Sequence, residues 1–484
     1  MMHTLPVVLT LAATASPSSE WAVLSPEGSE VPPARMLYSY LEAQARAFFD
    51  ARRAAIEALA SPEDVRRRQE ALRARFIAAL GGFPERTPLN PRVVGTLDGD
   101  GYRVERVIYE SRPGHHVTAN LYLPEGKPPF PGVLVPCGHS ANGKASEPYQ
   151  RVAILLAKNG MAALCYDPIG QGERSQILDA AGKPQMGNTA EHTMVGVGAL
   201  LVGQSTATFR IWDGMRSLDY LASRPEIDPT RLGCTGNSGG GTLTAYLMAL
   251  DDRILAAAPS CYLTTLERLF ATIGPQDAEQ NITGQVAFGM DHADYLLLRA
   301  PKPTLMCVAT KDYFDIQGAW TTFREAKRIY GLLGFGERVD LFEYGDGHGF
   351  SRPRRQAAMR WMRRWLLGKD DAPKEGEFAV HRDEMLQCTV AGQVLREFPG
   401  EKSVTDFCFE REKQLSPARA RAWREEGPQA CLQRVRKLIA LPDTVPAAPC
   451  VETSTARLGQ VSVRKLRFDT EPGIAVPLAA ISIN

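Results

Sequence analysis

The strongest constraint on the fold is a regular alternation of apolar strand-like runs and helix-like segments from about residue 130 to residue 367. The runs PGVLVPCG at 131–138, MAALCYDP at 161–168 and PTLMCVATKD at 303–312 are almost continuously apolar, which is typical of strands buried on both faces. Segments with helical spacing, such as RVAILLAKNG at 151–160, separate them. An alternation of this length predicts an α/β fold with a doubly wound, mostly parallel sheet.

A G-x-S-x-G pattern, GNSGG at 236–240, lies where the predicted strand RLGCT meets the predicted helix TLTAYLMAL. The tight turn between strand and helix requires residues without a Cβ, and it projects the hydroxyl of Ser238 above the sheet edge. The dipole and the free amides of the helix favour the negative charge that develops there during acyl transfer. The pattern predicts that Ser238 is a nucleophile; a glycine-rich turn without function is the alternative.

A serine nucleophile needs a base, and the base needs an acid that orients it. His348 lies in the glycine turn YGDGHGF after the predicted strand VDLFEY, and only one other histidine, His381, follows the acid candidates. Asp312 is the first carboxylate after the strand that ends in VATKD, and Asp315 competes with it. The order serine, acid, histidine is that of serine enzymes built on such a sheet. We therefore predict a triad of Ser238, Asp312 and His348.

Backbone N–H groups beside the nucleophile are the expected oxyanion donors. We predict that they belong to Gly239 and to His139, which follows the strand PGVLVPCG. The imidazole of His139 either lines the pocket or packs within its loop. Glu191 and His192 lie in a glycine-rich segment that we expect to be irregular, and both are candidates for the pocket wall. The chain has no CxxC pair and no cysteine–histidine spacing typical of zinc, so we expect no metal and no cofactor.

Charge and hydropathy narrow the classes of macromolecular partner. With 56 Lys and Arg against 55 Asp and Glu, the net charge is +1, so no global field attracts nucleic acid or an anionic membrane. No apolar stretch reaches the roughly 20 residues that a membrane-spanning helix needs. We therefore expect neither nucleic acid nor a membrane as a partner.

The N-terminal segment has features of a secretory signal peptide. An apolar run from Leu5 to Ala13 leads into the small-residue sequence Ala13-Thr14-Ala15 and then into a polar Ser/Pro stretch, a pattern that predicts cleavage near Ala15. No Lys or Arg precedes the run, and a frayed apolar N-terminus is the alternative. We expect residues 1–15 to be removed and the protein to be secreted or periplasmic. A disulfide among the last four of its nine cysteines is left open.

Pattern changes along the chain predict its organisation. Residues 21–95 form a mainly helical N-terminal segment, and residues 96–370 carry the alternating strands and helices. Residues 262–300 break that alternation and are predicted to form a lid over the site. Residues 371–445 are polar and helical in pattern, and residues 446–484 read as strands again.

The chain contains one internal repeat. VERVIYESRPGHHV at 104–117 aligns with VRKLRFDTEPGIAV at 463–476, at an offset of 359 residues and with four identities. Both copies read as two strands around a Pro-Gly turn. We interpret residues 446–484 as the incomplete start of a second copy of the 96–370 domain, with chance similarity of two hairpins as the alternative.

Five motifs together resemble the α/β-hydrolase superfamily, and within it bacterial acetylxylan esterases related to dienelactone hydrolases and to prolyl-oligopeptidase-type catalytic domains. The motifs are CGHSANGK, YDPIGQGER, RPEIDPTRLGCTGNSGGGT, APKPTLMCVATKD and DGHGF. The resemblance covers about residues 100–367 and implies that Ser238 is the nucleophile, Asp312 the acid and His348 the base. The chain departs from the family pattern in having Cys137-Gly138 where His-Gly is usual, and Gly239 where the better-defined acetylxylan esterases have Gln.

These observations predict a serine carboxylic-ester hydrolase that forms an acyl-enzyme. Its expected partner is an ester of a short acyl group, on a small molecule or on an acetylated plant polysaccharide. A prolyl-oligopeptidase-type peptidase is the alternative enzyme, but the N-terminal segment is too short for the propeller such enzymes usually carry. A non-catalytic binding module is the third alternative, which a missing triad residue would have favoured. The predicted lid has scattered apolar residues and no long apolar run, which favours short acyl groups.

Overall fold

The computed structural model describes residues 22–24, 31–441, 444 and 447–483. The predicted signal peptide at residues 1–15 lies outside these residues. The chain divides into two compact units, one of residues 48–420 and one of residues 1–47 together with 421–484. Each unit is described by itself.

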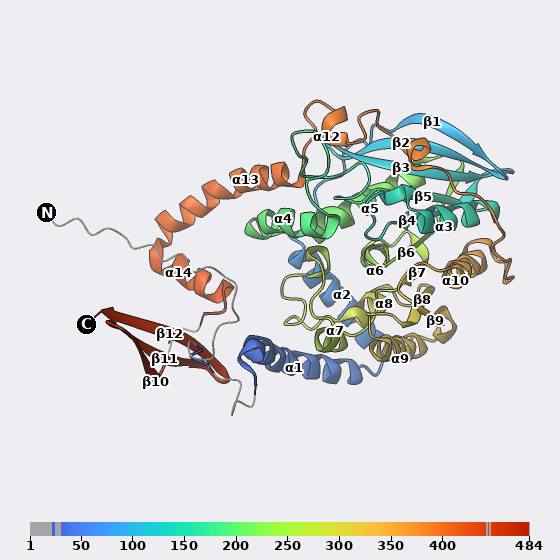
Figure 1. The fold of residues 1–484 in the computed structure, drawn as a ribbon. Helices are drawn as coiled ribbons and strands as arrows, with labels where there is room; N and C mark the ends of the chain where they lie inside the picture. The colour runs from blue at the N-terminus through green and yellow to red at the C-terminus, as the bar shows by residue number, and fades with distance from the viewer. Residues whose placement is uncertain (1–21, 25–30, 442–443, 445–446, 484) are drawn as a thin grey trace. The chain divides into compact units, whose positions relative to one another are not determined.

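The larger unit is built on a nine-stranded sheet with the order β1-β2-β3-β5-β4-β6-β7-β8-β9 (Figure 1). The strands are β1 (Arg92–Gly99), β2 (Tyr102–Arg112), β3 (His115–Pro124), β4 (Phe130–Pro136), β5 (Ala162–Tyr166), β6 (Ile227–Asn237), β7 (Ile254–Ser260), β8 (Thr304–Lys311) and β9 (Val339–Gly347). Strands β4 to β9 pair in parallel, and β1 to β3 are antiparallel to their neighbours. The prediction of a mostly parallel α/β sheet is confirmed, although β1 was not predicted.

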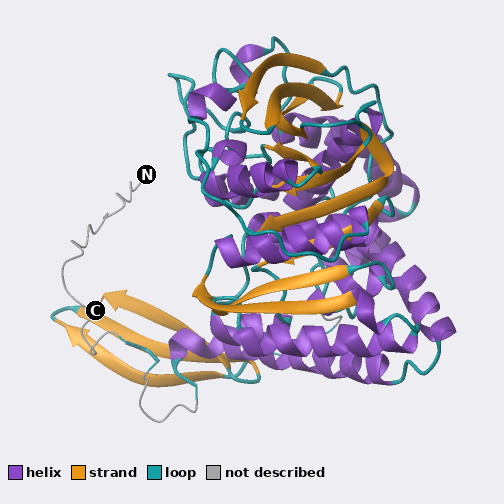
Figure 2. Cartoon of the chain, turned by 90° about the vertical axis from the view of Figure 1, so that its right-hand side faces the viewer, coloured by secondary structure: helices purple, strands orange, loops and turns teal. Residues whose placement is uncertain are grey.

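Helices lie on both faces of this sheet (Figure 2). They are α3 (Glu147–Lys158), α4 (Asn188–Leu201), α5 (Thr206–Ser223), α6 (Gly239–Leu250), α7 (Leu266–Thr272), α8 (His292–Arg299), α9 (Ile316–Leu332) and α10 (Arg352–Met362), the last continued by a π-helical turn at Arg363–Leu367. Helix α3 packs against α10, while α5 packs against α6 and α6 against α8. Both faces of the central strands are therefore covered, which explains their continuous apolar runs.

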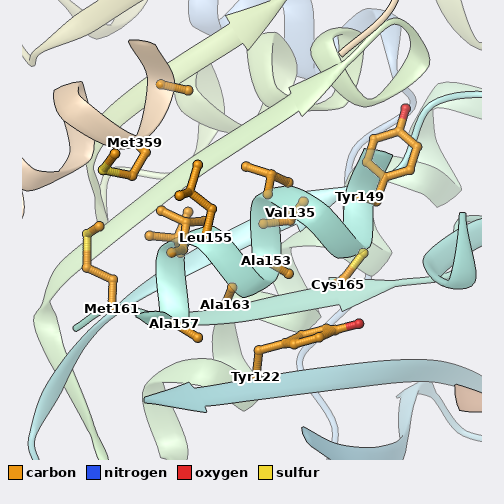
Figure 3. Packing of buried hydrophobic residues seen from close by; sticks show 14 of the residues in the cluster. Tyr122, Val135, Tyr149, Ala153, Leu155, Ala157, Met161, Ala163, Cys165 and Met359 are labelled. Carbon is orange, nitrogen blue, oxygen red and sulfur yellow. The ribbon is translucent and has the colours of Figure 1, made fainter. Parts of the chain in front are cut away.

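The core between α3 and the sheet shows this packing directly (Figure 3). Val135 of β4, Cys165 of β5, Leu155 of α3 and Met359 of α10 belong to one buried cluster. All four side chains are at most 2% exposed. This core holds the strands whose carboxyl ends carry the site.

The N-terminal segment contains two helices, α1 (Met36–Glu57) and α2 (Pro62–Ala79). Ser61 and Asp64 form a capping box at the start of α2, as its sequence predicts. Buried Arg52 binds Asp294 of α8 at 2.5 Å, and Arg68 binds the same carboxylate at 2.8 Å. These ion pairs tie the end of α1 and all of α2 to the helix that closes the 262–300 insert.

Two short helices, α11 (Asp383–Leu386) and α12 (Val394–Glu397), follow the sheet, and two longer ones come after them, α13 (Val404–Glu425) and α14 (Gly427–Leu438). The chain between α11 and α12 is anchored on the sheet unit, because Glu173 accepts hydrogen bonds from the backbone N–H groups of Cys388 and Thr389 at 2.8 and 2.6 Å. All nine cysteines lie among the described residues and are unpaired.

The C-terminal residues form a separate three-stranded antiparallel sheet of β10 (Cys450–Leu458), β11 (Val461–Glu471) and β12 (Ile474–Ile483) (Figure 1). The sequence predicted only the two strands around the Pro-Gly turn, which are β11 and β12, and it missed β10. Register shifts at Glu452/Ser454 and Asp469/Glu471 repeat those at Val93/Gly95 and Glu110/Arg112, at the sequence offset of the repeat. The interpretation of this sheet as the start of a second hydrolase copy stays a prediction.

By length and composition, no single helix among the described residues could cross a membrane. Helices α4 and α5 pass that test only as a pair, bent by 101° at the break between them.

Candidate active site

Ser238 stands on the turn between β6 and α6 with φ 59° and ψ −125°, a conformation that L-residues rarely adopt. Its N–H donates to the carbonyl of Ser260 at 2.9 Å. A Cβ at Gly236 would lie 2.5 Å from the carbonyl oxygen of Pro136, and one at Gly240 would lie 2.2 Å from the same atom. Both glycines are therefore required by close approach of the backbone, as the G-x-S-x-G pattern predicts.

The structure brings Asp312 and His348 together. Nδ1 of His348 lies 2.9 Å from Oδ1 of Asp312, which also accepts from the N–H of Phe314 at 3.1 Å. Asp312 follows β8 and His348 follows β9, and these two strands are parallel neighbours. Their carboxyl ends meet at the edge of the sheet where β6 delivers Ser238.

The competing carboxylate, Asp315, has a different role. Its side chain accepts from the N–H of Gly318 at 2.9 Å and so caps α9. It also binds Arg268 in a bidentate pair at 3.0 and 2.8 Å. The geometry thus matches the predicted acid with the base and leaves Asp315 outside the cluster.

Tyr313, which was not predicted, is the other partner of His348. Its hydroxyl lies 2.9 Å from Nε2 of the imidazole, and the two rings stack with centroids 4.3 Å apart. Among the described residues, no hydrogen bond joins the hydroxyl of Ser238 directly to His348. The only sequence signal for Tyr313 is its place directly after Asp312.

Cys261 lines the same cluster from the end of β7, with φ 50°. Its sulfur and the donor atoms of Asp312 and His348 lie within 4.8 Å of one another. Burial, with the nearby charge of Asp312, raises the pKa of the Cys261 thiol to about 12. The thiol is therefore protonated at neutral pH and adds no charge beside the acid.

The loop after β4 meets the Ser238 turn, as predicted. The hydroxyl of Tyr149 accepts from the N–H of Gly138 at 2.6 Å and donates to the carbonyl of Asn237 at 3.0 Å. The N–H groups of His139 and Gly239 donate to no backbone or side-chain acceptor in the described part of the chain. The His139 ring lies against Gly239, since a Cβ there would be 3.0 Å from Cε1 of the imidazole. The two predicted oxyanion donors are thus neighbours.

The side chain of His139 is held by a buried polar cluster. Glu279 of the insert binds His139 Nε2 at 2.5 Å, His192 Nδ1 at 3.1 Å and an Arg210 guanidinium nitrogen at 2.6 Å. Burial opposes the ionisation of Glu279, but Arg210 and both imidazoles hold its pKa well below its usual range. Burial and the charge of Arg210 lower the pKa of His192. Glu279 is therefore surrounded by one guanidinium and two imidazoles, and a second carboxylate, Asp277, lies 3.6 Å from Nδ1 of His139.

This cluster also has a metal-like donor set. His139, His192 and Glu279 bring donor atoms within 4.8 Å of one another, and two imidazoles with a carboxylate are common zinc ligands. The charge of Glu279 is already balanced by Arg210.

Neither Glu279 nor Arg210 was predicted, because each reaches the site only through the tertiary fold.

Glu191 and His192 do not lie in an irregular segment, as was predicted, but on helix α4. Glycines at 196 and 198 conceal its helical pattern. Glu191 is buried and accepts from the N–H of Ile177 at 2.9 Å, so it supports a turn. Burial raises its pKa. His192 faces Glu279, 3.1 Å away, and is itself fully buried.

A second buried ion cluster lies where the loop after β4, which carries His139, meets the loop after β5. The ammonium of Lys144 lies 2.6 Å from Asp167 and 2.5 Å from Glu173. Lys144 is 2% exposed, and its N–H also donates to Asp167 at 2.8 Å. These bonds join the loop after β4 to the loop after β5, which carries the motif YDPIGQGER.

The chain is similar to several known proteins. Residues 96–289 match the family model of acetyl xylan esterase (AXE1), a range that includes Ser238, His139 and Glu279. The chain is also 25% identical over 312 residues to a Bacillus subtilis (strain 168) protein designated hydrolase YtaP. That alignment covers 61% of this chain and 98% of the relative.

Two solved structures show the same fold. Methylesterase BT1017 gives a TM-score of 0.61 at 24% identity, covering 76% of this chain and 78% of that chain. A Bacteroides fragilis NCTC 9343 protein assigned as an acetyl xylan esterase gives 0.51 at 18% identity, covering 63% of this chain and 82% of that chain. Residues 96–289 are thus similar to the acetyl xylan esterase (AXE1) family, and the larger unit shares the α/β fold of these two solved structures.

Proposed function

We propose that this protein is a serine carboxylic ester hydrolase that uses Ser238, Asp312 and His348 on short-acyl esters, including acetyl groups on plant polysaccharide. One observation carries the proposal. The hydrogen bond of 2.9 Å between Asp312 and His348 lies at the same sheet edge as a serine on a strained strand-to-helix turn. Three chain segments far apart in sequence converge there, which a glycine-rich turn without function does not require.

The proposed mechanism follows from the hydrogen bonds of His348. Its Nδ1–H faces Asp312, so Nε2 carries the lone pair of the base. Nε2 takes the proton of Ser238 as the serine oxygen attacks the ester carbonyl. The resulting oxyanion lies toward the N–H groups of Gly239 and His139, at the N-terminus of α6. His348 then protonates the leaving alcohol. In the second half of the reaction, His348 takes a proton from water, the water oxygen attacks the acyl carbonyl, and His348 returns the proton to Ser238 as the acid product leaves.

The surroundings of Gly239 support a small acyl group. The His139 ring lies against Gly239 and is fixed by buried Glu279, so this side of the serine has a polar and firmly held wall. In the insert, Ile282 and Met290 are 5% and 1% exposed, and they pack inward instead of lining a channel for a long chain.

A substrate panel tests the proposal. We expect hydrolysis of p-nitrophenyl acetate to exceed that of the octanoate, and release of acetate from acetylated xylan. A methyl carboxylate ester also belongs in the panel, because the solved structure with TM-score 0.61 is named a methylesterase. If the folded protein hydrolysed none of these esters, the result would contradict the proposed function.

We further propose that the protein is exported, since a polysaccharide substrate lies outside the cell. Expression of the full chain should yield a mature protein that begins near Ser16, as determined by N-terminal sequencing. A mature protein that retains residues 1–15 would contradict export by this signal.

A further inference from the structure

The hydroxyl of Tyr313 is hydrogen-bonded to Nε2 of His348, the atom that must accept the serine proton in the proposed mechanism. It lies 2.9 Å from Nε2, the nitrogen opposite the one bound to Asp312. Because Nδ1 carries the ring hydrogen toward Asp312, Nε2 is an acceptor and Tyr313 is the donor. The lone pair of the base is therefore already used in the free protein.

The same hydroxyl lies near the nucleophile. Burial raises the pKa of Tyr313, and a hydrogen bond with Ser238 opposes this shift. An oxygen that is hydrogen-bonded to Nε2 beside the nucleophile stands where a serine hydrolase holds the leaving-group oxygen, because Nε2 delivers its proton there. Tyr313 thus occupies the place of the alcohol part of the ester.

Tyr313 is able to leave this place. Its side chain is 45% exposed, whereas the acid before it, Asp312, is 2% exposed. Its ring stacks on that of His348, with an angle of 30° between the planes. Rotation of the side chain toward solvent frees Nε2 without moving the acid or the base.

We propose that Tyr313 is a specificity-determining residue whose hydroxyl fills the leaving-group subsite and caps His348 until the alcohol part of the substrate displaces it. This inference rests on the proposed function. It assigns the alcohol side of the site to Tyr313, while His139, which lies against Gly239, bounds the other side. Changes at Tyr313 should therefore alter the preference for the alcohol and not for the acyl chain.

The titratable and charged groups that face His348 or the turn carrying it are Asp312, Tyr313, Cys261, Arg354 and Asp346. Of these, only Tyr313 is hydrogen-bonded to Nε2. Removal of its hydroxyl should therefore change the hydrogen bonding of Nε2 and leave the bond between Nδ1 and Asp312 in place.

The kinetic test compares Tyr313→Phe and Tyr313→Ala with Tyr344→Phe, a control on β9 whose side chain is 46% exposed. Loss of one neutral hydrogen bond should raise kcat/KM for acetate esters by about 2- to 10-fold in Tyr313→Phe. Tyr313→Ala should favour benzyl over ethyl acetate relative to the wild type. The ratio of p-nitrophenyl butyrate to acetate hydrolysis should stay unchanged, as should all rates in Tyr344→Phe.

Several results would overturn the inference. Unchanged or reduced kcat/KM in folded Tyr313→Phe would show that the hydroxyl does not block the base. A shift in acyl preference as large as the shift in alcohol preference would place Tyr313 on the wrong side of the site. Circular dichroism melting separates these results from loss of folding.

Nuclear magnetic resonance of the imidazole nitrogens, assigned with His348→Gln, gives a readout independent of turnover. We expect the chemical shift of His348 Nε2 to differ between Tyr313→Phe and the wild type, because the hydrogen bond from the Tyr313 hydroxyl is lost, and an unchanged shift would overturn the inference. If no ester is hydrolysed by the wild type, the proposed function fails, but this spectrum still tests the contact between Tyr313 and His348. The two failures are therefore distinguishable.

Discussion

The carboxylate of Glu279 lies 2.5 Å from Nε2 of His139 and so joins the insert between β7 and β8 to the loop after β4. The same carboxylate binds buried Arg210, whose side chain has no exposed surface. One residue of the insert thus fixes the wall beside Gly239. Through Glu279, the insert contributes to the candidate site, whereas its predicted role as a lid stays a prediction.

Glu279→Gln should lower the free energy of unfolding by about 3–5 kcal/mol, because it leaves the buried charge of Arg210 without its partner. Urea denaturation measures this loss. Glu267→Gln is the matched control, since Glu267 pairs with Arg53 at the surface with 48% exposure, and it should cost less than about 1 kcal/mol. Equal losses in the two variants would argue against a structural role of the Glu279 cluster.

Asp312→Asn should reduce kcat on p-nitrophenyl acetate by about 10⁴-fold, because the amide no longer holds His348 in the required tautomer. Asp315→Asn should retain most activity, although loss of an α9 cap should cost about 1 kcal/mol of stability. Steady-state kinetics of both variants decides between them. The reverse order would mean that the 2.9 Å contact of Asp312 does not identify the acid.

Burial of His292 makes stability depend on acid pH. Its pKa is lowered to about 3, while an unfolded histidine titrates near pH 6.5. Between these two pKa values the unfolded chain binds a proton at His292 and the folded chain does not. Protonation therefore favours the unfolded chain, and the free energy of unfolding decreases as pH falls below about 6.5. The slope is up to about 1.4 kcal/mol per pH unit for one group.

His292→Gln should accordingly flatten the pH dependence of unfolding between pH 6.5 and pH 4. Urea midpoints at several pH values give the slope, which is the informative quantity even if the variant is less stable overall. Neighbouring Asp291, whose pKa burial raises to about 6, is present in both proteins. Parallel curves for the variant and the wild type would rule out His292 as a source of acid sensitivity.

Removal of residues 447–484 takes away the whole β10–β12 sheet and should leave kcat/KM on p-nitrophenyl acetate within about twofold. The physical reason is that no candidate catalytic or oxyanion residue lies in these strands, which belong to the smaller unit. Truncated protein that folds but has lost activity would show that the C-terminal sheet helps to form the site.

Local sequence patterns predicted the sheet and the placement of Ser238 because their causes are local. Continuous apolar runs correspond to strands such as β4, whose residues Val133, Leu134 and Val135 have no exposed surface. The glycines beside Ser238 are needed by backbone approach within the same turn. Strand β1 escaped prediction because it is an exposed edge strand, without the apolar run that marks a buried one.

The rest of the site depends on contacts between distant segments. Glu279 and His139 are 140 positions apart in the sequence, and the local periodicity of apolar residues does not predict a contact between them. Tyr313 follows the acid directly, but only the fold shows that its hydroxyl faces His348. The helix α4 was mistaken for an irregular segment because its glycines at 196 and 198 weaken the helical pattern.

The most direct test of the account is the turnover of p-nitrophenyl acetate by Ser238→Ala, with folding checked by circular dichroism. Because Ser238 is proposed to form the acyl-enzyme, its loss should lower kcat by at least about 10⁴-fold while the melting curve stays close to that of the wild type. Turnover near the wild-type rate by the folded variant would contradict the central claim.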